Sequence, residues 1–412
     1  MKEVVDFLPV LLGSDVNAYG MARAFHEAYG ITSVAVCKLQ LSATADTRLI
    51  HFEFEPDLEN PEKFLKKLYE VADKYTGKKL VLVPCSDGYI KLMIRFQAEL
   101  RDKYCFNCIS EPLLHALQLK ENFYKLCDKY GFAYPKTTVL TKENWQTEKL
   151  PFDFPVVIKA SNSVEYWKCS FPGKLKVFVA QDRPEFERIF KAIYSSSYQD
   201  HLTVQEYIPG DDSQMRVLNC YVGTDHKVKL MSLGHALLEE HTPQGIGSYA
   251  AVINTFDKKL LDQVQFFLED IGYSGFANFD IKLDPRDNTY KLFEINIRQG
   301  RSSFFVTGSG YNLAKWLVDD VVYHKPMELT YATNESLWTM IPKGVIKKYC
   351  QNKELTAKAM QLIKEGKWCN SLYYKPDMSL KRWLRVTVYT LHHYEKYRKY
   401  YGKKGLAENA GK

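Results

Sequence analysis

The hydrophobic and polar positions of the first hundred residues change repeatedly between the period of a strand and that of a helix. Three apolar runs predict buried strands, at residues 7–12 (FLPVLL), 31–37 and 80–84 (LVLVP). Three further stretches have apolar side chains at helical spacing, at residues 18–29, 61–74 and 88–101. This alternation predicts an α/β domain with a small parallel sheet whose carboxyl edge binds ligands. Asp15 and Asn17 lie in the first loop at that edge and are candidate acceptor-site residues.

From residue 119 onward the predicted elements follow a different order. A helix over residues 121–130 ends at Gly131. A compact ββαβ module follows, with strands at 154–159 and 175–180, a helix at 184–194 and a strand at 202–208. Strands near 215–221 and 228–233, a helix over 258–271 and a hairpin come next. This second half is therefore predicted to be α+β, with a larger antiparallel sheet.

The hairpin at residues 276–298 (FANFDIKLDPRDNTYKLFEINIR) is the most informative segment of the chain. Two alternating strands flank the turn sequence DPRDN. Because successive strand side chains point to opposite faces, Asp280 lies on the polar face of the first strand. Glu294, Asn296 and Arg298 share the polar face of the return strand. Counting back from the turn places Asp280 opposite or nearly opposite Glu294.

Two carboxylates held opposite one another repel unless a cation lies between them. Asp280, Glu294 and the amide oxygen of Asn296 form an all-oxygen set, typical of a site for Mg²⁺ or Mn²⁺. The alternative is an amphipathic hairpin whose polar face is merely solvated. We predict the metal site, because other residues are predicted to bind a nucleotide that the metal would accompany.

These other residues have the properties of a nucleotide clamp. Lys159 ends the apolar strand PVVIK, where its ammonium group is placed to meet a phosphate. A surface lysine with a buried stem has the same pattern. Residues 205–212 (QEYIPGDD) carry a strand into a Pro-Gly turn. Such a strand end offers backbone N–H and C=O groups to an adenine edge, with an acidic side chain for ribose hydroxyls.

In this order and spacing, the strand-ending lysine, QEYIPGDD, FD, and FEIN with its following arginine resemble the ATP-grasp superfamily of carboxylate–amine ligases. The resemblance covers roughly residues 1–320. It implies an ATP-grasp fold with an N-terminal parallel-sheet domain, a small ββαβ ATP lid and a larger antiparallel-sheet domain. ATP and Mg²⁺, with Mn²⁺ as an alternative metal, are the implied cofactors. The corresponding boundaries are 1–118, 119–212, 213–330 and a basic helical C-terminal segment at 331–412.

Carried over by position, the resemblance assigns three groups of site residues. The phosphate-contacting lysines are Lys120 and Lys159. The adenine hinge and ribose ligand are Glu206, Tyr207, Ile208 and Asp212. The metal ligands are Asp280, Glu294 and Asn296.

Within the superfamily, the stretches VEYW, LKENFYKLCDKYGFAYPKT and RQGRSSFF resemble D-aspartate ligases. Those enzymes join the β-carboxylate of D-aspartate to the lysine side-chain amine of a peptidoglycan precursor, so the resemblance implies these two substrates. The loop after Lys159 departs from it by lacking the glycine-rich phosphate flap of many ATP-grasp enzymes. Two alternatives stay open, namely a ligase for another amino acid, such as a dipeptide synthetase, and a non-catalytic ATP-binding regulatory protein.

A glycine-containing turn follows the hairpin and is predicted to bind the amino acid. Its guanidinium forks and N–H groups suit carboxylates. The predicted substrate-binding residues are Arg298, Arg301, Ser302 and Ser303, and the predicted catalytic residues are Arg298, Arg301 and Lys159. The alternative for Arg301 is a helix cap or a surface ion pair.

His235, Glu239, Glu240 and His241 form a further polar cluster. Their spacing matches no defined set of metal ligands, so a solvated strand end or loop is favoured over a second metal site or a general base.

Composition narrows the protein class. The chain has 412 residues, of which 46% are apolar and 25% charged, as expected of a globular protein with more than one subdomain. Its start lacks the charge pattern of a secretion signal, and no window approaches the ~20 apolar residues of a membrane span. Nine cysteines, an odd number, are typical of a reducing compartment, and the lone C-x-x-C at Cys105 and Cys108 is weak evidence for a metal site. A cytoplasmic protein is predicted.

Positive charge is concentrated at the C-terminus, where residues 345–412 carry 16 Lys or Arg against 5 Asp or Glu. Leu384, Val388 and Leu391 have helical spacing in this region. Two interpretations are equally favoured, an amphipathic helix against an anionic membrane surface and a helix that packs its Leu/Val stripe on the body. Interleaved aromatic and basic residues also suit nucleic acid, which we do not expect as a partner.

Overall fold

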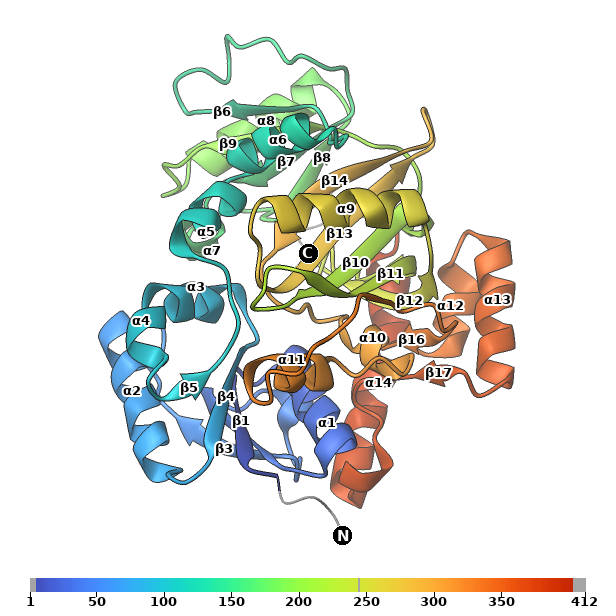
Figure 1. Ribbon diagram of the computed structural model, residues 1–412. Coiled ribbons are helices and arrows are strands. Elements are labelled where there is room, and N and C mark those ends of the chain that lie inside the picture. The colour runs from blue at the N-terminus through green and yellow to red at the C-terminus, as the bar shows by residue number, and fades with distance from the viewer. Residues whose placement is uncertain (1–4, 244, 403–412) are drawn as a thin grey trace.

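Three β-sheets organise the chain in the computed structural model, which describes residues 5–243 and 245–402. Figure 1 shows the N-terminal sheet at the bottom, a small sheet at the top and the largest sheet between them. The α/β prediction and the ATP-grasp-like arrangement of a parallel sheet, a small lid and a larger sheet are confirmed.

The N-terminal sheet is wholly parallel, as predicted. Its strand order is β3 (Ile50–Phe54), β2 (Ser33–Cys37), β1 (Phe7–Leu12), β4 (Lys79–Pro84) and β5 (Tyr104–Cys105). Helix α1 (Val16–Tyr29) packs on one face, and α2 (Pro61–Lys74) and α3 (Asp87–Arg95) pack on the other. A third helix beside α3 is α4 (Gln97–Leu100). The carboxyl ends of β1 and β4 therefore face the rest of the molecule with short polar loops.

Two helices, α5 (Glu111–Gln118) and α6 (Lys120–Tyr130), lead to the small sheet. Gly131 ends α6 with φ 69°, a left-handed conformation that suits glycine. The small sheet has the order β6 (Thr137–Leu140), β9 (Leu202–Glu206), β7 (Val156–Ala160) and β8 (Val177–Ala180). Helix α8 (Arg183–Tyr194) covers one face, and the short α7 (Ser163–Lys168) follows β7. The predicted ββαβ module is present, with β6 as an added edge.

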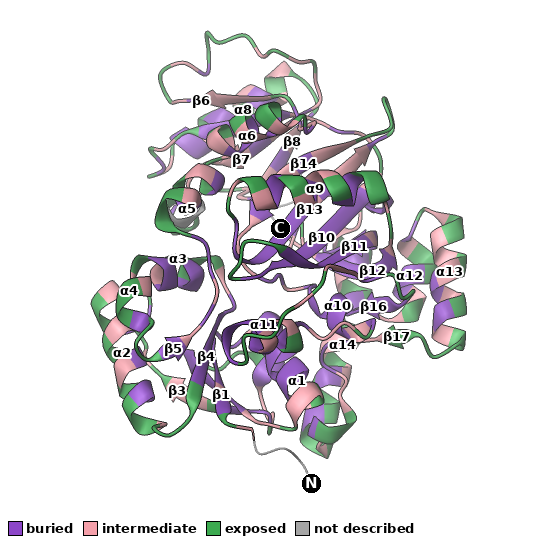
Figure 2. Cartoon of the chain, in the orientation of Figure 1, coloured by how far each residue is buried: buried purple, intermediate pink, exposed green. Residues whose placement is uncertain are grey.

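The large sheet is mainly antiparallel. Its order is β14 (Thr289–Asn296), β13 (Gly275–Asp284), β10 (Met215–Val222), β11 (Val228–Glu239), β12 (Tyr249–Thr255), β16 (Leu337–Thr339) and β17 (Trp368–Cys369), with β15 (Thr330–Tyr331) beside β11. Helix α9 (Lys258–Asp270) packs on one face, and α10 (Phe304–Gly308) and α11 (Leu313–Val321) pack on the other, against α1. The central strands are consequently buried (Figure 2).

The segment predicted to be a basic helical tail also contains β-strands. Strands β16 and β17 complete the large sheet, so residues 331–412 are not purely helical. The helices are α12 (Lys343–Tyr349), α13 (Lys353–Lys364) and α14 (Leu380–Tyr400). Across the described residues, none of the helices combines the length and the apolar character that crossing a bilayer requires.

Helix α14 does not pack on the body by the Leu/Val stripe, which was one of the two interpretations that the sequence left open. Leu384, Val388 and Leu391 are 52%, 51% and 52% exposed. The buried positions are instead Arg382, Val386, His393 and Tyr397. The Leu/Val stripe was therefore the wrong packing face, because the body presents buried carboxylates and carbonyls that a polar helix face satisfies.

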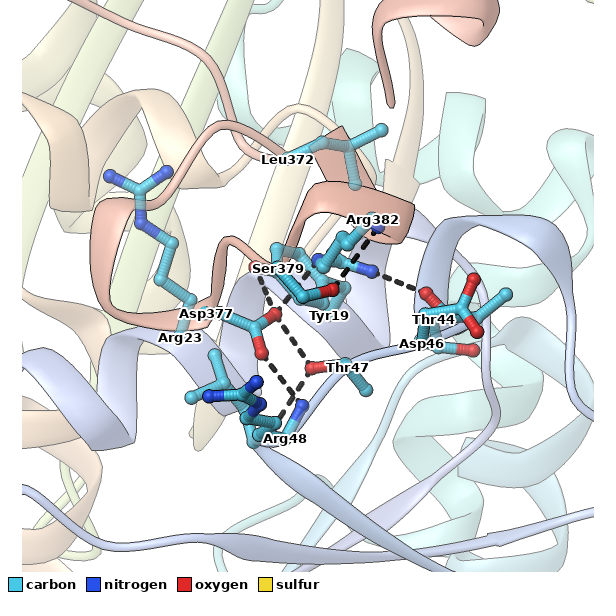
Figure 3. Close-up of polar contacts among 12 residues, drawn as sticks. Tyr19, Arg23, Thr44, Asp46, Thr47, Arg48, Leu372, Asp377, Ser379 and Arg382 are labelled. Atoms are coloured by element: carbon cyan, nitrogen blue, oxygen red, sulfur yellow. Dashed lines mark hydrogen bonds and ion pairs between the residues drawn. The ribbon is translucent and has the colours of Figure 1, made fainter. Parts of the chain in front are cut away.

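A buried ion pair within the C-terminal segment is joined to the N-terminal domain by hydrogen bonds (Figure 3). Arg382 Nε lies 2.9 Å from Asp377 Oδ2, and both side chains are 0% exposed. Tyr19 and Thr47 donate their hydroxyls to the same carboxylate at 2.8 and 2.7 Å, and the Arg48 N–H donates to it at 2.6 Å. The guanidinium also donates to backbone carbonyls at residues 43 and 45. Most polar atoms of the two side chains thus have hydrogen-bond partners, as burial of an ion pair requires.

We expect Arg382→Met to lower the free energy of unfolding by about 3–5 kcal/mol, since it leaves the Asp377 carboxylate buried without its counterion. The double variant Asp377→Asn/Arg382→Met should lose clearly less than the sum of the single variants, because the residues are coupled. Urea unfolding measures both effects.

Arg385→Met is the matched control, because Arg385 lies on the same helix and pairs with Asp46 at a partly exposed site, where an ion pair contributes only about 0–1 kcal/mol. Equal losses for Arg382→Met and Arg385→Met would contradict the structural importance of the buried pair.

Candidate active site

The polar face of the β13–β14 hairpin has the predicted arrangement. Asp280 pairs directly with Glu294 across the two strands, and Asn278 pairs with Asn296. The strand register shifts just after Asp280, which marks a local irregularity at the carboxylate pair. The two carboxylates and the Asn296 amide therefore come together on one patch of the sheet.

Contacts around Asp280 hold it in place beside its like-charged neighbour. Its Oδ1 accepts a hydrogen bond from the Tyr249 hydroxyl at 2.9 Å, and its Oδ2 accepts one from the Asn296 amide at 3.3 Å. Burial and the Glu294 carboxylate raise the pKa of the Asp280 carboxyl. This is the electrostatic state that a divalent cation would relieve, and the carboxylate and amide oxygens are hard ligands that fit Mg²⁺. In the described ranges, no group of three or more His, Cys, Asp or Glu residues is placed to hold a metal, so the set depends on Asn296 as its third member.

Two lysines from other elements reach the same carboxylates. Lys120, at the start of α6, places Nζ 3.0 Å from Glu294 Oε2 and holds the pKa of Glu294 below its usual range. Lys159 on β7 lies with Nζ 5.5 Å from the centre of the Phe293 ring. Burial and the neighbouring Lys120 ammonium lower the pKa of Lys159 to about 7. The helix before the lid, the lid and the hairpin thus concentrate positive charge where phosphates would meet the metal.

The predicted adenine hinge connects the lid to the hairpin turn. Glu206 accepts a hydrogen bond from the Lys136 N–H at 2.9 Å and forms an ion pair with Arg286 at 3.1 Å. The carbonyl of Ile208 accepts a hydrogen bond from Lys282 at 2.7 Å. Beside the hinge lies a cavity of about 680 Å³, lined by residues 150–155, Lys136, Glu206, Tyr207, Pro209 and Arg286. Neither Lys159 nor the hairpin carboxylates line this cavity, so it marks only the hinge end of the cleft.

Asp212, the predicted ribose ligand, is buried at the start of the short 3₁₀ helix η2 (Asp212–Gln214). Its Oδ2 accepts hydrogen bonds from the Glu239 N–H at 2.9 Å and from His241 Nε2 at 2.8 Å. These contacts fix the orientation of the carboxylate, and its contact with ribose stays a prediction.

The substrate turn is tethered to the carboxyl edge of the parallel sheet. Asn17 donates to the carbonyls of Cys85 and Gln299 at 3.0 and 2.9 Å, and Gln299 donates to the Pro84 carbonyl at 3.0 Å. Both amide hydrogens of Asn17 are therefore used inside the protein, whereas the sequence suggested a role for Asn17 in acceptor binding. Asp15 accepts a hydrogen bond from the Ala18 N–H and caps α1.

The two arginines of the turn are each held by a carboxylate. Arg298 meets Asp87, with Nε 3.0 Å from Oδ1 and Nη2 3.0 Å from Oδ2. Arg301 Nη2 lies 3.1 Å from Glu240 Oε1. The Asp87 carboxylate is exposed, whereas the Glu240 carboxylate is buried. Each guanidinium is thus held by a protein carboxylate, and Arg298 Nη2 also lies 3.5 Å from Asn296 Oδ1 on the hairpin.

The serines of the turn lie beneath its surface. Ser302 and Ser303 are both buried. The Ser303 hydroxyl accepts a hydrogen bond from the Gly300 N–H and donates one to Asn219 Oδ1. Ser303 therefore shapes the turn, and the predicted contact of both serines with substrate stays a prediction.

The polar cluster at residues 235–241 was expected to be solvated, and this expectation is wrong. Glu239, Glu240 and His241 are all buried. Their partners lie on segments distant in sequence, namely Arg301 and His393 for Glu240, and Asp212 for His241. Long-range ion pairs of this kind leave no local signature, so the spacing alone was uninformative.

Comparison with known proteins identifies the family. No family model matches the chain. A D-aspartate ligase of Enterococcus faecium (strain Aus0004) is 43% identical over 409 residues, which is 96% of this chain and 97% of that protein. The chain belongs to the D-aspartate ligase family. Like its relatives, this D-aspartate ligase family member is an ATP-dependent carboxylate–amine ligase that uses ATP and Mg²⁺.

Solved structures share the fold at low sequence identity. An L-amino acid ligase from Bacillus licheniformis has a TM-score of 0.53 at 13% identity, covering 77% of this chain and 75% of its own. The biotin carboxylase domain of a Hydrogenobacter thermophilus 2-oxoglutarate carboxylase, solved with MgADP, has a TM-score of 0.59 at 14% identity, covering 81% of this chain and 73% of its own. The ATP-grasp fold of the D-aspartate ligase family is thereby confirmed.

Several residues of the site were not found from the sequence. Gln205 donates to the hydroxyls of Tyr124 and Thr137, and joins α6 to the small sheet beside Lys159. The sequence does contain a signal for Gln205. The alternation in LTVQE places Gln205 on the same strand face as Thr203, which pairs with Lys159 across the two strands. Tyr249 lies in an apolar strand whose pattern offers no such signal.

His235 provides a pH-dependent test of this region. Its Nε2 donates to the Ser213 carbonyl at 2.7 Å, and burial together with Arg216 lowers its pKa to about 4. The unfolded chain therefore binds more protons than the folded chain between about pH 6.5 and 4, so His235 makes stability fall as pH falls through that window. When the pH is lowered from 7 to 5, the free energy of unfolding should fall in both proteins. We expect this fall to be about 1–2 kcal/mol smaller for His235→Gln than for the parent.

Urea unfolding at both pH values measures this difference. The glutamine retains an N–H donor for the Ser213 carbonyl, so the variant tests titration with little change in hydrogen bonding. Parallel loss of stability in the two proteins would rule out His235 as a source of acid sensitivity.

Proposed function

We propose that this ligase joins the β-carboxylate of D-aspartate to the lysine side-chain amine of a peptidoglycan precursor. The observation that carries the proposal is the pair of arginines in the turn after the hairpin, each of which contacts a carboxylate. Arg298 grips the Asp87 carboxylate through two nitrogen–oxygen contacts of 3.0 Å, and Arg298 Nη2 is 3.5 Å from Asn296 Oδ1. A substrate with two carboxylates would find one cation at each end. The 43% identity to an E. faecium D-aspartate ligase supports the same amino acid.

The proposed chemistry proceeds by acyl phosphate formation. A carboxylate oxygen of the amino acid attacks the γ-phosphorus of ATP, the bond to the bridging oxygen breaks, and ADP leaves. The acceptor amine then attacks the acyl carbon, the C–O bond to phosphate breaks, and the amine gives up a proton as the amide forms. Bound Mg²⁺, or Mn²⁺ in its place, supplies charge neutralisation at the phosphate oxygens.

In this scheme the protein positions the substrates and neutralises their charge, and no side-chain nucleophile is needed. Lys120 and Lys159 stabilise the charge on the phosphates, with Asp280, Glu294 and Asn296 as the metal ligands. Arg298 and Arg301 orient the carboxylates of the amino acid. Glu206 and Tyr207 at the cavity, together with Ile208, contact adenine, and Asp212 contacts ribose.

The test is release of ADP with each of a series of D- and L-amino acids, in the presence of a lysine-containing wall-precursor peptide. We expect D-aspartate to give the fastest release, because two carboxylates engage both arginines. Glu294→Gln should slow D-aspartate-dependent release roughly 100-fold or more, since it removes a charged ligand at the site of phosphoryl transfer.

Asp287→Asn is the matched control, because Asp287 lies in the turn of the same hairpin and contacts Thr289 and Lys291 away from the site. It should retain the parental rate. Faster release with a monocarboxylic amino acid would assign another substrate, and parental release by Glu294→Gln would refute the metal site.

A cytoplasmic location with peripheral contact to the inner membrane face is part of the proposal. Its support is the outward face of α14, which gathers six exposed large apolar side chains, namely Leu380, Trp383, Leu384, Val388, Leu391 and Tyr394. Exposed Lys381, Arg385, Arg398 and Lys399 lie on the same helix. Apolar side chains flanked by cations suit the headgroup region of an anionic bilayer.

We expect the full-length protein to float with vesicles rich in phosphatidylglycerol and not with phosphatidylcholine vesicles. The triple variant Leu384→Gln/Val388→Gln/Leu391→Gln should stay at the bottom of the gradient, because the exposed apolar area is lost. Phe266→Gln on α9, which removes a 64% exposed aromatic residue elsewhere, should float like the parent. Flotation of the triple variant at the parental level would exclude α14 as the contact.

A further inference from the structure

Arg301 is held from behind by a buried carboxylate. Glu240 directly follows β11 and is 3% exposed, and its Oε1 lies 3.1 Å from Arg301 Nη2. Arg301 itself is about one-third exposed, with its guanidinium at the surface of the substrate turn. One nitrogen of the guanidinium is therefore fixed to the body, and its Nε is buried as well.

His393 on α14 fixes Glu240 in turn. Its Nε2 lies 3.2 Å from Glu240 Oε1, and its Nδ1 lies 3.1 Å from the carbonyl oxygens of Tyr389 and Thr390. All of these oxygens are acceptors, so both contacts become hydrogen bonds when each ring nitrogen carries a proton. The ring is 0% exposed. The His393 ring and the Arg301 guanidinium therefore contact the same oxygen, Oε1, of the Glu240 carboxylate.

The electrostatics of the group are those of a rigid anion receptor. Although burial opposes ionisation, the hydrogen bond from His393 and the charge of Arg301 hold the pKa of Glu240 at about 2. Arg298 differs, because its partner Asp87 has a 60% exposed side chain and lies at the start of a surface helix.

We propose that Glu240 and His393 are positioning residues that hold Arg301 in place for a carboxylate of the amino-acid substrate, so that α14 forms part of the substrate site. The inference rests on the proposed function, in which Arg301 binds that carboxylate. Fixing the guanidinium before binding removes the cost of ordering its long side chain when the substrate arrives. Loss of either support therefore weakens binding of the amino acid and leaves binding of ATP unchanged.

The experiment compares KM for the amino acid with KM for ATP. Glu240→Gln and His393→Phe should each raise KM for the amino acid roughly tenfold or more, as loss of a supporting partner typically does, while KM for ATP stays at the parental value. His393→Gln retains one N–H donor toward Glu240 and should recover part of the loss. Glu53→Gln is the matched control, because Glu53 is also a shielded carboxylate between two cations, Lys67 and Lys74, on the edge strand of the N-terminal sheet.

Unfolding temperatures and Arg301→Lys complete the design. A similar increase in both KM values, or unchanged KM values with a lowered unfolding temperature, would show that Glu240 and His393 act only in folding and would overturn the inference. If Arg301→Lys raises KM for the amino acid and Glu240→Gln does not, positioning fails and the proposed function stands. If Arg301→Lys itself leaves that KM unchanged, the assignment of Arg301 fails as well.

Discussion

Two like charges forced to face each other determine how the active site is built. The register of β13 and β14 places Asp280 against Glu294, and the sheet fixes both backbones. Repulsion in a shielded site has to be balanced locally, and the surroundings supply the balance from several directions. Lys120 comes from α6, Lys159 from the small sheet, and a hydroxyl from Tyr249 on β12. Lid, linker and large sheet therefore meet at this pair, where a divalent cation would relieve the repulsion.

The sequence predicts features that depend on neighbouring residues and fails to predict those that depend on contacts between distant residues. Period and turn chemistry are local, so the parallel sheet, the ββαβ module and the pairing of Asp280 with Glu294 were all predicted before the fold was known. The pairing of Arg301 with Glu240 joins positions 61 residues apart, and that of Glu240 with His393 joins positions 153 apart. No periodicity connects such residues. The polar cluster at 235–241 was therefore read as solvated, although it is buried.

The C-terminal helix shows how a sound local rule fails when tertiary contacts are polar. A stripe of leucine and valine normally marks the buried face of a helix. In α14 the body instead offers the Asp377 and Glu240 carboxylates and the Glu239 carbonyl, which Arg382, His393 and Tyr397 satisfy. Only the folded structure shows that the body is polar at this place. The apolar stripe therefore faces outward, and packing on the body does not explain it.

The connection between the two ends of the chain also affects the order of folding during synthesis. Arg382 contacts backbone carbonyls more than 330 positions earlier, and β16 and β17 close the large sheet from residues beyond 336. The parallel sheet has all its strands once residue 105 has left the ribosome and can fold early, since domains generally fold as units. Arg301, by contrast, lacks the buried Glu240–His393 contact behind it until α14 has emerged. A nascent chain that ends before α14 thus holds a complete parallel sheet but not the polar contacts that anchor this region.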